Sequence, residues 1–148
     1  MTTTQTTEPP IIRQSVGKAH GWINEVADEL GTEDRESAFR ALRAVLHTLR
    51  DRIGVDEAAQ LAAQLPIFVR GVYYENWDPS RTPMTYRDVD SFLERVAAEM
   101  VSHGETEASF AVAAVSRVLA RHVSEGELDD VRAALPADLR SLLGPESR

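Results

Sequence analysis

Cysteine is absent from the chain, which excludes disulfide bonds, thiol nucleophiles and cysteine-ligated zinc. No apolar run approaches the roughly 18 residues that a membrane-spanning helix needs. Glycine-rich phosphate-binding motifs are also missing, and Lys18 is the only lysine. With 24 acidic and 16 basic residues, the net charge of -8 repels a nucleic-acid backbone. We therefore expect an acidic protein with neither nucleic acid nor a membrane as its partner.

Strand patterns are lacking too, because apolar and polar residues nowhere alternate in short runs bounded by turns. Apolar residues instead recur every three or four positions, which is typical of one face of a helix. The clearest series runs through Val16, Ala19, Ile23, Val26 and Leu30. The chain is therefore predicted to be all-α.

The two halves of the chain repeat one another. When residues 22–73 are aligned with 92–143, at an offset of 70 positions, 13 of the 52 pairs are identical. Chance would give about four. This repetition predicts a compact helical bundle of two tandem four-helix repeats related by pseudo-twofold symmetry. A unit of about 50 residues buries little apolar surface, so the two repeats are expected to share one core.

A single helical domain is expected over residues 13–143. Repeat one covers about 19–73, a connector covers 74–88, and repeat two covers about 89–143. Residues 1–12 are expected to form a disordered tail, because they are rich in threonine, end near a proline pair and lack the marks of a signal peptide. A second tail is expected at 144–148.

Two helix starts carry the spacing of a capping box, in which a hydroxyl and a carboxylate each bond a free backbone N–H. These are Ser124 with Glu127, and Thr85 with Asp88. The long second helix of repeat one has Arg40, Arg43, His47 and Arg50 on one side and is expected to present a solvated basic face. Its counterpart is almost continuously apolar from Ser109 to Ala120 and is expected to be enclosed on most sides.

Two polar pairs occur in both repeats: Glu57 with Arg70, and Glu127 with Arg140. One interpretation is a pair of equivalent binding pockets. The other, which we favour, is that each Arg caps helix carbonyls or bridges to its Glu across the Leu-Pro break between the third and fourth helices. A duplicated break explains duplicated polar residues beside it.

Signatures of catalysis and of metal binding are weak. His47 with Asp51, and His103 with Glu107, lie one helical turn apart, but each pair supplies only two ligands. A surface His beside an acid is common in so acidic a chain. No nucleophile motif accompanies them. We therefore expect no catalytic residue, no metal and no cofactor.

The connector holds the densest group of aromatic residues, with Tyr73, Tyr74 and Trp77 close together. Tyr and Trp often anchor interfaces, because they combine a large apolar area with one polar atom. Either these rings close the connector onto the core, or they remain exposed and mark a contact surface. The candidate binding residues are Tyr73, Tyr74, Trp77, Arg70, Arg81 and Arg140.

Several ordered motifs resemble the bacterial family of unknown function DUF2267. They include Ala41-Leu42-Arg43-Ala44-Val45-Leu46, Gln64-Leu65-Pro66, Tyr73-Tyr74 and Trp77-Asp78-Pro79, and the second repeat echoes them at Leu135-Pro136. The resemblance covers about Ala19 to Leu143. It implies a compact all-helical domain in the bacterial cytoplasm, and it implies no activity.

Taken together, these features predict a non-enzymatic helical module for protein binding or scaffolding. Its partner would be an unknown protein or, through the first repeat, a second copy of the chain. The alternative is a small-ligand-binding protein or an enzyme, with a pocket between the repeats lined by the connector aromatics and nearby arginines. A polar cavity between the repeats would favour the second function.

Overall fold

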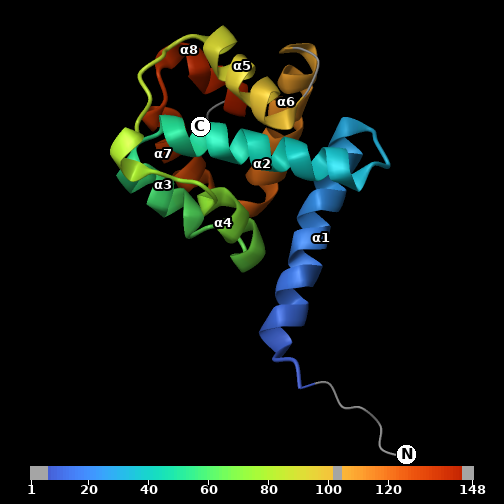
Figure 1. Cartoon of the computed structure of the whole chain (residues 1–148). Coiled ribbons are helices and arrows are strands. Elements are labelled where there is room, and N and C mark those ends of the chain that lie inside the picture. Colours follow the sequence, from blue (N-terminus) through green and yellow to red (C-terminus); the bar gives the residue numbers. More distant parts are fainter. Residues whose placement is uncertain (1–6, 102–104, 145–148) are drawn as a thin grey trace, which may run out of the picture.

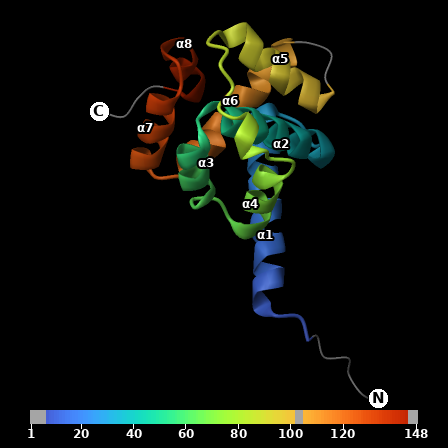
Figure 2. The same cartoon turned by 60° about the vertical axis from the view of Figure 1, so that its left-hand side comes forward.

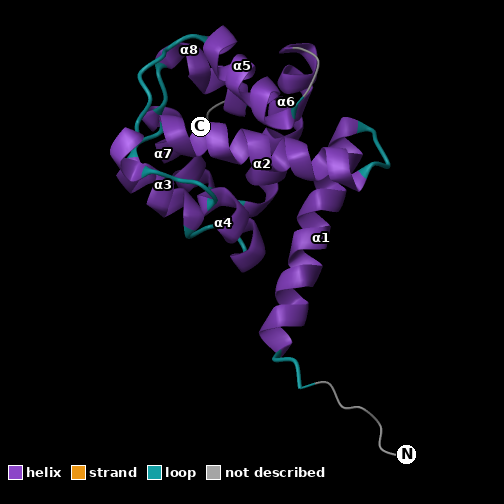
Figure 3. Ribbon diagram, in the orientation of Figure 1, coloured by secondary structure: helices purple, strands orange, loops and turns teal. Residues whose placement is uncertain are grey.

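The computed structural model describes residues 7–101 and 105–144, and over these ranges it contains eight α-helices, two short 3-10 helices and no strand (Figures 1 and 3). The predicted all-α class is confirmed. In the same part of the chain, no helix has both the length and the apolar character to cross a bilayer. The elements are α1 Pro10–Leu30, α2 Arg35–Arg52, α3 Val55–Ala62, α4 Ile67–Tyr74, η1 Pro79–Arg81, α5 Val89–Met100, α6 Glu105–His122, α7 Glu125–Ala134, α8 Ala137–Arg140 and η2 Ser141–Leu143.

Helix positions repeat along the chain at the spacing found in the sequence. Helix α2 begins and ends 70 positions before α6, and α1 ends 70 positions before α5. Within the repeats α1 packs on α2 and α5 on α6, and between them α1 packs on α6 and α2 on α5. Helices α2 and α6 also contact each other, as do α3 and α7. A twofold axis that passes between α2 and α6 and between α3 and α7 would produce this set of contacts. The rotation that would superimpose one repeat on the other stays a prediction.

Helix α2 runs through the middle of the body, with α3 and α4 on one side of it and α5 on the other (Figures 1 and 2). The prediction of a solvated basic face on this helix is correct for Arg40, which is exposed, but wrong for His47 and Arg50. His47 and Arg50 are each 3% exposed, and Arg52 is buried as well. Sequence periodicity cannot distinguish a solvated Arg from one whose charge is satisfied inside the fold.

Buried polar side chains of α2 hold the connector. Arg50 Nη1 donates to the carbonyls of Tyr73 and Glu75, both at 2.8 Å. His47 Nε2 donates to the carbonyl of Val72 at 2.6 Å. Arg52 Nε donates to the carbonyl of Tyr86 at 2.7 Å. These bonds tie the end of α4 and the connector to α2, so the polar side chains of α2 determine the path of the loop.

Helix α6 is less enclosed than its sequence predicts. Its inward side is buried from Ala111 to Leu119, but Phe110 is 63% exposed and Arg117 and Ala120 also face outward. Nearly every position between Ser109 and Ala120 is apolar, so the outward side of α6 also carries apolar residues. Helix α2 is therefore more enclosed than expected, and α6 less enclosed.

The first and fifth helices begin differently from the predictions. Helix α1 starts at Pro10, so residues 10–12 are helical and do not belong to a disordered tail. Helix α5 starts at Val89, and its N-cap is Asp88, whose side chain accepts from the N–H of Ser91 at 2.9 Å. The capping box at Thr85 and Asp88 is therefore wrong, because Asp88 itself takes the cap position.

The ends of α1 and α5 share an unusual backbone turn. Gly31 ends α1 with φ of 70°, and Val101, at the matching position 70 residues later, ends α5 with φ of 54°. Glycine adopts this left-handed conformation without cost, whereas a β-branched side chain crowds its own backbone there. Repeat two thus keeps the turn but lacks the glycine.

Replacing Val101 by Gly should raise the free energy of unfolding by about 1 kcal/mol, because the strain of the left-handed turn is removed. Urea unfolding followed by circular dichroism measures the change. The same substitution at Val55, at the start of α3, should lower the free energy of unfolding. A loss of stability in Val101→Gly would contradict this interpretation.

Replacing Arg50 by Met should lower the free energy of unfolding by about 2–4 kcal/mol, because the buried carbonyl of Tyr73 and the carbonyl of Glu75 lose their donor. The matched control is Arg40→Met, on the exposed side of the same helix. Equal stabilities of the two variants in urea would show that Arg50 does not hold the connector.

Candidate functional site

The three connector aromatics lie together, but mostly inside the protein. Tyr73 is fully buried, and its hydroxyl donates to the carbonyl of Ala58 at 2.9 Å. Tyr74 and Trp77 are partly buried and stack with their ring centroids 5.2 Å apart. All three pack against the common core. Their main role in this fold is to close the connector, and only Tyr74 and Trp77 keep part of their surface accessible.

The three candidate arginines lie at different places. Arg70 donates to the carbonyls of Ala62 and Leu65 at 2.9 and 2.8 Å, at the end of α3. Arg140 donates to those of Arg132 and Leu135 at 3.1 and 3.2 Å, at the end of α7. The favoured interpretation of these two residues as helix caps is confirmed. Arg81 is exposed and pairs with Asp78 in η1.

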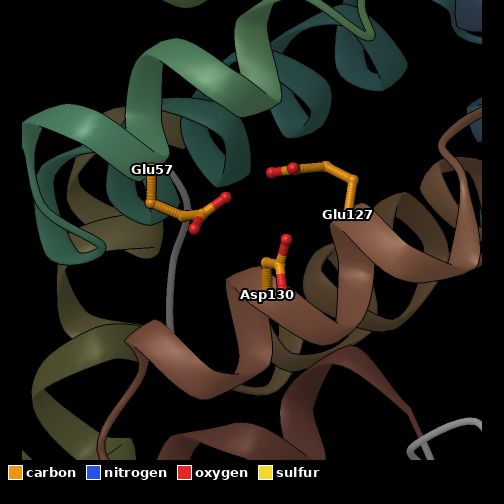
Figure 4. A group of neighbouring side chains, drawn as sticks. All are labelled: Glu57, Glu127 and Asp130. Carbon is orange, nitrogen blue, oxygen red and sulfur yellow. The ribbon is translucent and has the colours of Figure 1, made fainter.

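The duplicated acids do not bridge to these arginines. Glu57 on α3 and Glu127 on α7 point toward each other across the contact between the two repeats, and Asp130, one turn further along α7, completes the group (Figure 4). One carboxylate oxygen of each residue lies within 4.8 Å of those of the other two. We call Glu57, Glu127 and Asp130 the carboxylate cluster.

The local structure of α7 explains why Glu127 is available. Ser124 caps this helix, and its hydroxyl accepts from the N–H of Glu127 at 3.1 Å. In a full capping box the Glu127 carboxylate would accept from the N–H of Ser124. That N–H donates instead to Gln64 Oε1 at 3.2 Å. Half of the predicted box is therefore present, and the carboxylate turns toward Glu57.

Electrostatic compensation is poor at the carboxylate cluster. Among the described residues, no Arg, Lys or His forms an ion pair with any of its three members. Two ionised carboxylates about 4 Å apart repel by roughly 4 kcal/mol at an effective dielectric constant of 20. Glu127 is only 9% exposed. Its burial and the nearby carboxylates of Glu57 and Asp130 raise the pKa of Glu127 to about 8.

Sequence reasoning missed this cluster because it paired each Glu with an Arg of its own repeat. The available signal was the duplication itself. A residue at the same position of both repeats meets its counterpart wherever the two equivalent helices touch, as α3 and α7 do.

The His pairs considered as metal ligands do not form such sites. His47 Nδ1 contacts Glu99 Oε1 at 2.6 Å, while Asp51 forms an ion pair with Arg50. His103 lies outside the described residues, so the pair of His103 with Glu107 is not seen. The carboxylate cluster is the group of acids in the described part of the chain that could hold a metal ion.

A surface groove of about 540 Å³ draws on both repeats. Repeat one contributes Lys18, Trp22 and Arg70, and repeat two contributes His122, which stacks on Trp22 with ring centroids 4.7 Å apart. The connector aromatics do not line this groove. We call it the Trp22 groove.

The sequence model of the family described as an uncharacterized conserved protein (DUF2267) matches residues 19–142. The chain belongs to the DUF2267 family. The match begins within α1 and ends within η2, so it includes nearly all of both repeats, the carboxylate cluster and the Trp22 groove except Lys18. Among curated proteins, none matches the chain. Membership of DUF2267 therefore confirms the resemblance and assigns no activity.

In buffer with EDTA, stability should fall as the pH rises from about 5 to about 8. The unfolded chain releases the Glu127 proton near its ordinary pKa of 4.5, whereas the folded protein keeps it until about pH 8. The folded state therefore binds more protons in this range, and the slope is at most about 1.4 kcal/mol per pH unit.

Urea unfolding at several pH values measures this slope. Glu127→Gln should flatten it and be more stable than the wild type at pH 8. The control Glu125→Gln changes an exposed residue of the same helical turn and should keep the slope. If Glu127→Gln kept the wild-type slope of unfolding free energy against pH, a group other than Glu127 would cause the pH dependence.

Proposed function

We propose that this DUF2267 protein is a non-enzymatic scaffold module that binds protein through the N-terminal half of α1. The observation that carries the proposal is an apolar surface on that half helix. Ile11, Ile12 and Val16 are 50%, 49% and 45% exposed. Helix α1 extends away from the body in both views (Figures 1 and 2), so no other described element covers these residues.

The exposed residues continue a stripe that is already part of the core. Val26 and Ala19 are buried on α1, and Val16 and Ile12 follow at helical spacing toward its start. Two turns of a core-forming face thus lie beyond the core. Exposed apolar surface of this kind marks a contact site more often than it occurs without one.

A second copy of the chain is the partner that we propose. An antiparallel pair of α1 helices crossing at Gln14 would place Ile12 of each copy opposite Val16 of the other. The same register would bring the acidic Glu8 of each copy near the basic Lys18 and His20 of the other. The stripe is therefore complementary to itself in both shape and charge, as a twofold dimer requires.

A second candidate function is the binding of a small anion in the Trp22 groove. Lys18 and Arg70 line this groove beside the apolar ring of Trp22, and His122 lies there with its Nε2 2.6 Å from Glu25 Oε2. A groove that combines apolar walls with two permanent cations suits a small carboxylate or phosphate, which would have to lie away from Glu25. Chemical shifts of the Trp22 indole N–H during titration with acetate or inorganic phosphate, in wild type and Lys18→Met, would test this function.

For the location, we propose the bacterial cytoplasm. The absence of cysteine is compatible with a reducing compartment, and membership of DUF2267 agrees with a bacterial source.

The wild type should sediment as a monomer–dimer mixture whose dimer fraction rises with concentration. Placing Asp at both Ile12 and Val16 should raise the dimer dissociation constant by at least about tenfold, because two charges would enter an apolar contact. Analytical ultracentrifugation measures both species.

The control is Gln14→Asp, which adds one charge beside the stripe and should weaken the dimer less. Because Ile12 and Val16 lie outside the core, all variants should keep the helical signal of the wild type in circular dichroism. A wild type that stays monomeric at every concentration tested would refute self-association through α1.

A further inference from the structure

Inside the contact between the two repeats, two carboxylate oxygens have no hydrogen-bond donor. Oε2 of Glu57 and Oε2 of Glu127 are both shielded from solvent and have no partner. Glu127 as a whole is more than nine-tenths buried and points into the carboxylate cluster (Figure 4). Buried carboxylate oxygens are normally paired, protonated or bound to a metal ion.

No cationic side chain in the described part of the chain forms an ion pair with the carboxylate cluster. The arginines nearest along the chain have other partners, since Arg132 pairs with Asp129 and Arg52 donates to the carbonyl of Tyr86. A proton shared between Glu57 and Glu127 would satisfy two of the three carboxylates. It would leave the third, Asp130, adding negative charge to the same group.

We propose that the carboxylate cluster is a binding site for one divalent cation of calcium size, held between α3 of repeat one and α7 of repeat two. Three carboxylates offer only oxygen ligands, which hard cations such as Ca²⁺ prefer. Asp130 is exposed, so a hydrated ion can enter from its side and keep water on the ligand positions that the protein leaves open.

The spacing of the oxygens is compatible with an ion of calcium size. Ligands on opposite sides of a Ca²⁺ ion are up to about 5 Å apart. The three oxygens all lie within 4.8 Å of one another. Ca²⁺ also accepts flexible coordination, whereas Mg²⁺ demands a near-ideal octahedron and loses its water reluctantly, so we assign the site to Ca²⁺.

A bound cation would change how much the contact between the repeats contributes to the stability of the folded protein. Without it, α3 and α7 bring like charges together. With it, the three carboxylates are linked through one ion that belongs to both repeats. Binding to the folded state alone stabilises that state by mass action, so the ion would act as a clamp between the repeats.

The test uses the full chain after removal of metal with EDTA. Isothermal titration calorimetry with CaCl₂ should give one site per chain, and MgCl₂ should bind more weakly. Glu127→Gln and Asp130→Asn should each weaken Ca²⁺ binding by at least about tenfold, because each removes one ligand charge. Ca²⁺ should raise the melting temperature of the wild type by more than that of either variant.

Glu125→Gln is the matched control, because Glu125 lies on the first turn of the same helix but outside the cluster. It should bind Ca²⁺ as the wild type does. Glu127→Gln keeps the shape of the side chain and Asp130 is exposed, so both variants should fold, which circular dichroism checks.

Three results would overturn the proposal. The first is no heat and no change in melting temperature with Ca²⁺, which would leave a shared proton as the explanation of the cluster. The second is binding that is equally strong in wild type and Glu127→Gln, which would show diffuse attraction to an acidic surface. The third is a preference for Mg²⁺, which would refute an ion of calcium size.

Discussion

The fold depends on buried polar side chains of α2. This helix lies inside the body, yet it carries Arg50, His47 and Arg52, each of which would be costly to bury without a partner. Their partners include carbonyls of the connector and of the end of α4. Each buried side chain thereby gains an acceptor, and each carbonyl gains a donor. The long connector between the repeats therefore has a defined path although little of it is helical.

Duplication explains the site as well as the fold. Two copies of one helical unit pack so that α3 and α7 touch, and any polar residue on that face meets its own counterpart. For a neutral residue, contact with its counterpart costs little free energy. A carboxylate meets a like charge, which costs free energy unless a proton or a cation intervenes. The acid at this position is present in both repeats, so both the proposed ion and the pH dependence arise from one arrangement.

Much of the fold could be predicted from the sequence because helix ends and repeats are local or periodic signals. Leu30 and Met100 end their helices as expected, and the Leu-Pro breaks restart them. Burial was predicted less well. Arg50 looks like a solvated residue in the sequence, and only its distant partners, Tyr73 and Glu75, make it a core residue. The same limit applied to Glu127. The spacing predicted that its carboxylate accepts from the N–H of Ser124, but this N–H donates to the distant Gln64 instead.

The two proposed contacts differ in what they require of the protein. The stripe on α1 lies outside the core, so its residues can change without loss of the fold, and binding there adds a contact to a finished structure. The carboxylate cluster lies within the contact between the repeats, so its charge state is part of folding stability itself. An ion bound there would alter how firmly the repeats are joined, whereas a partner on α1 would not. Self-association and ion binding can therefore vary independently, because no residue is shared between the two surfaces.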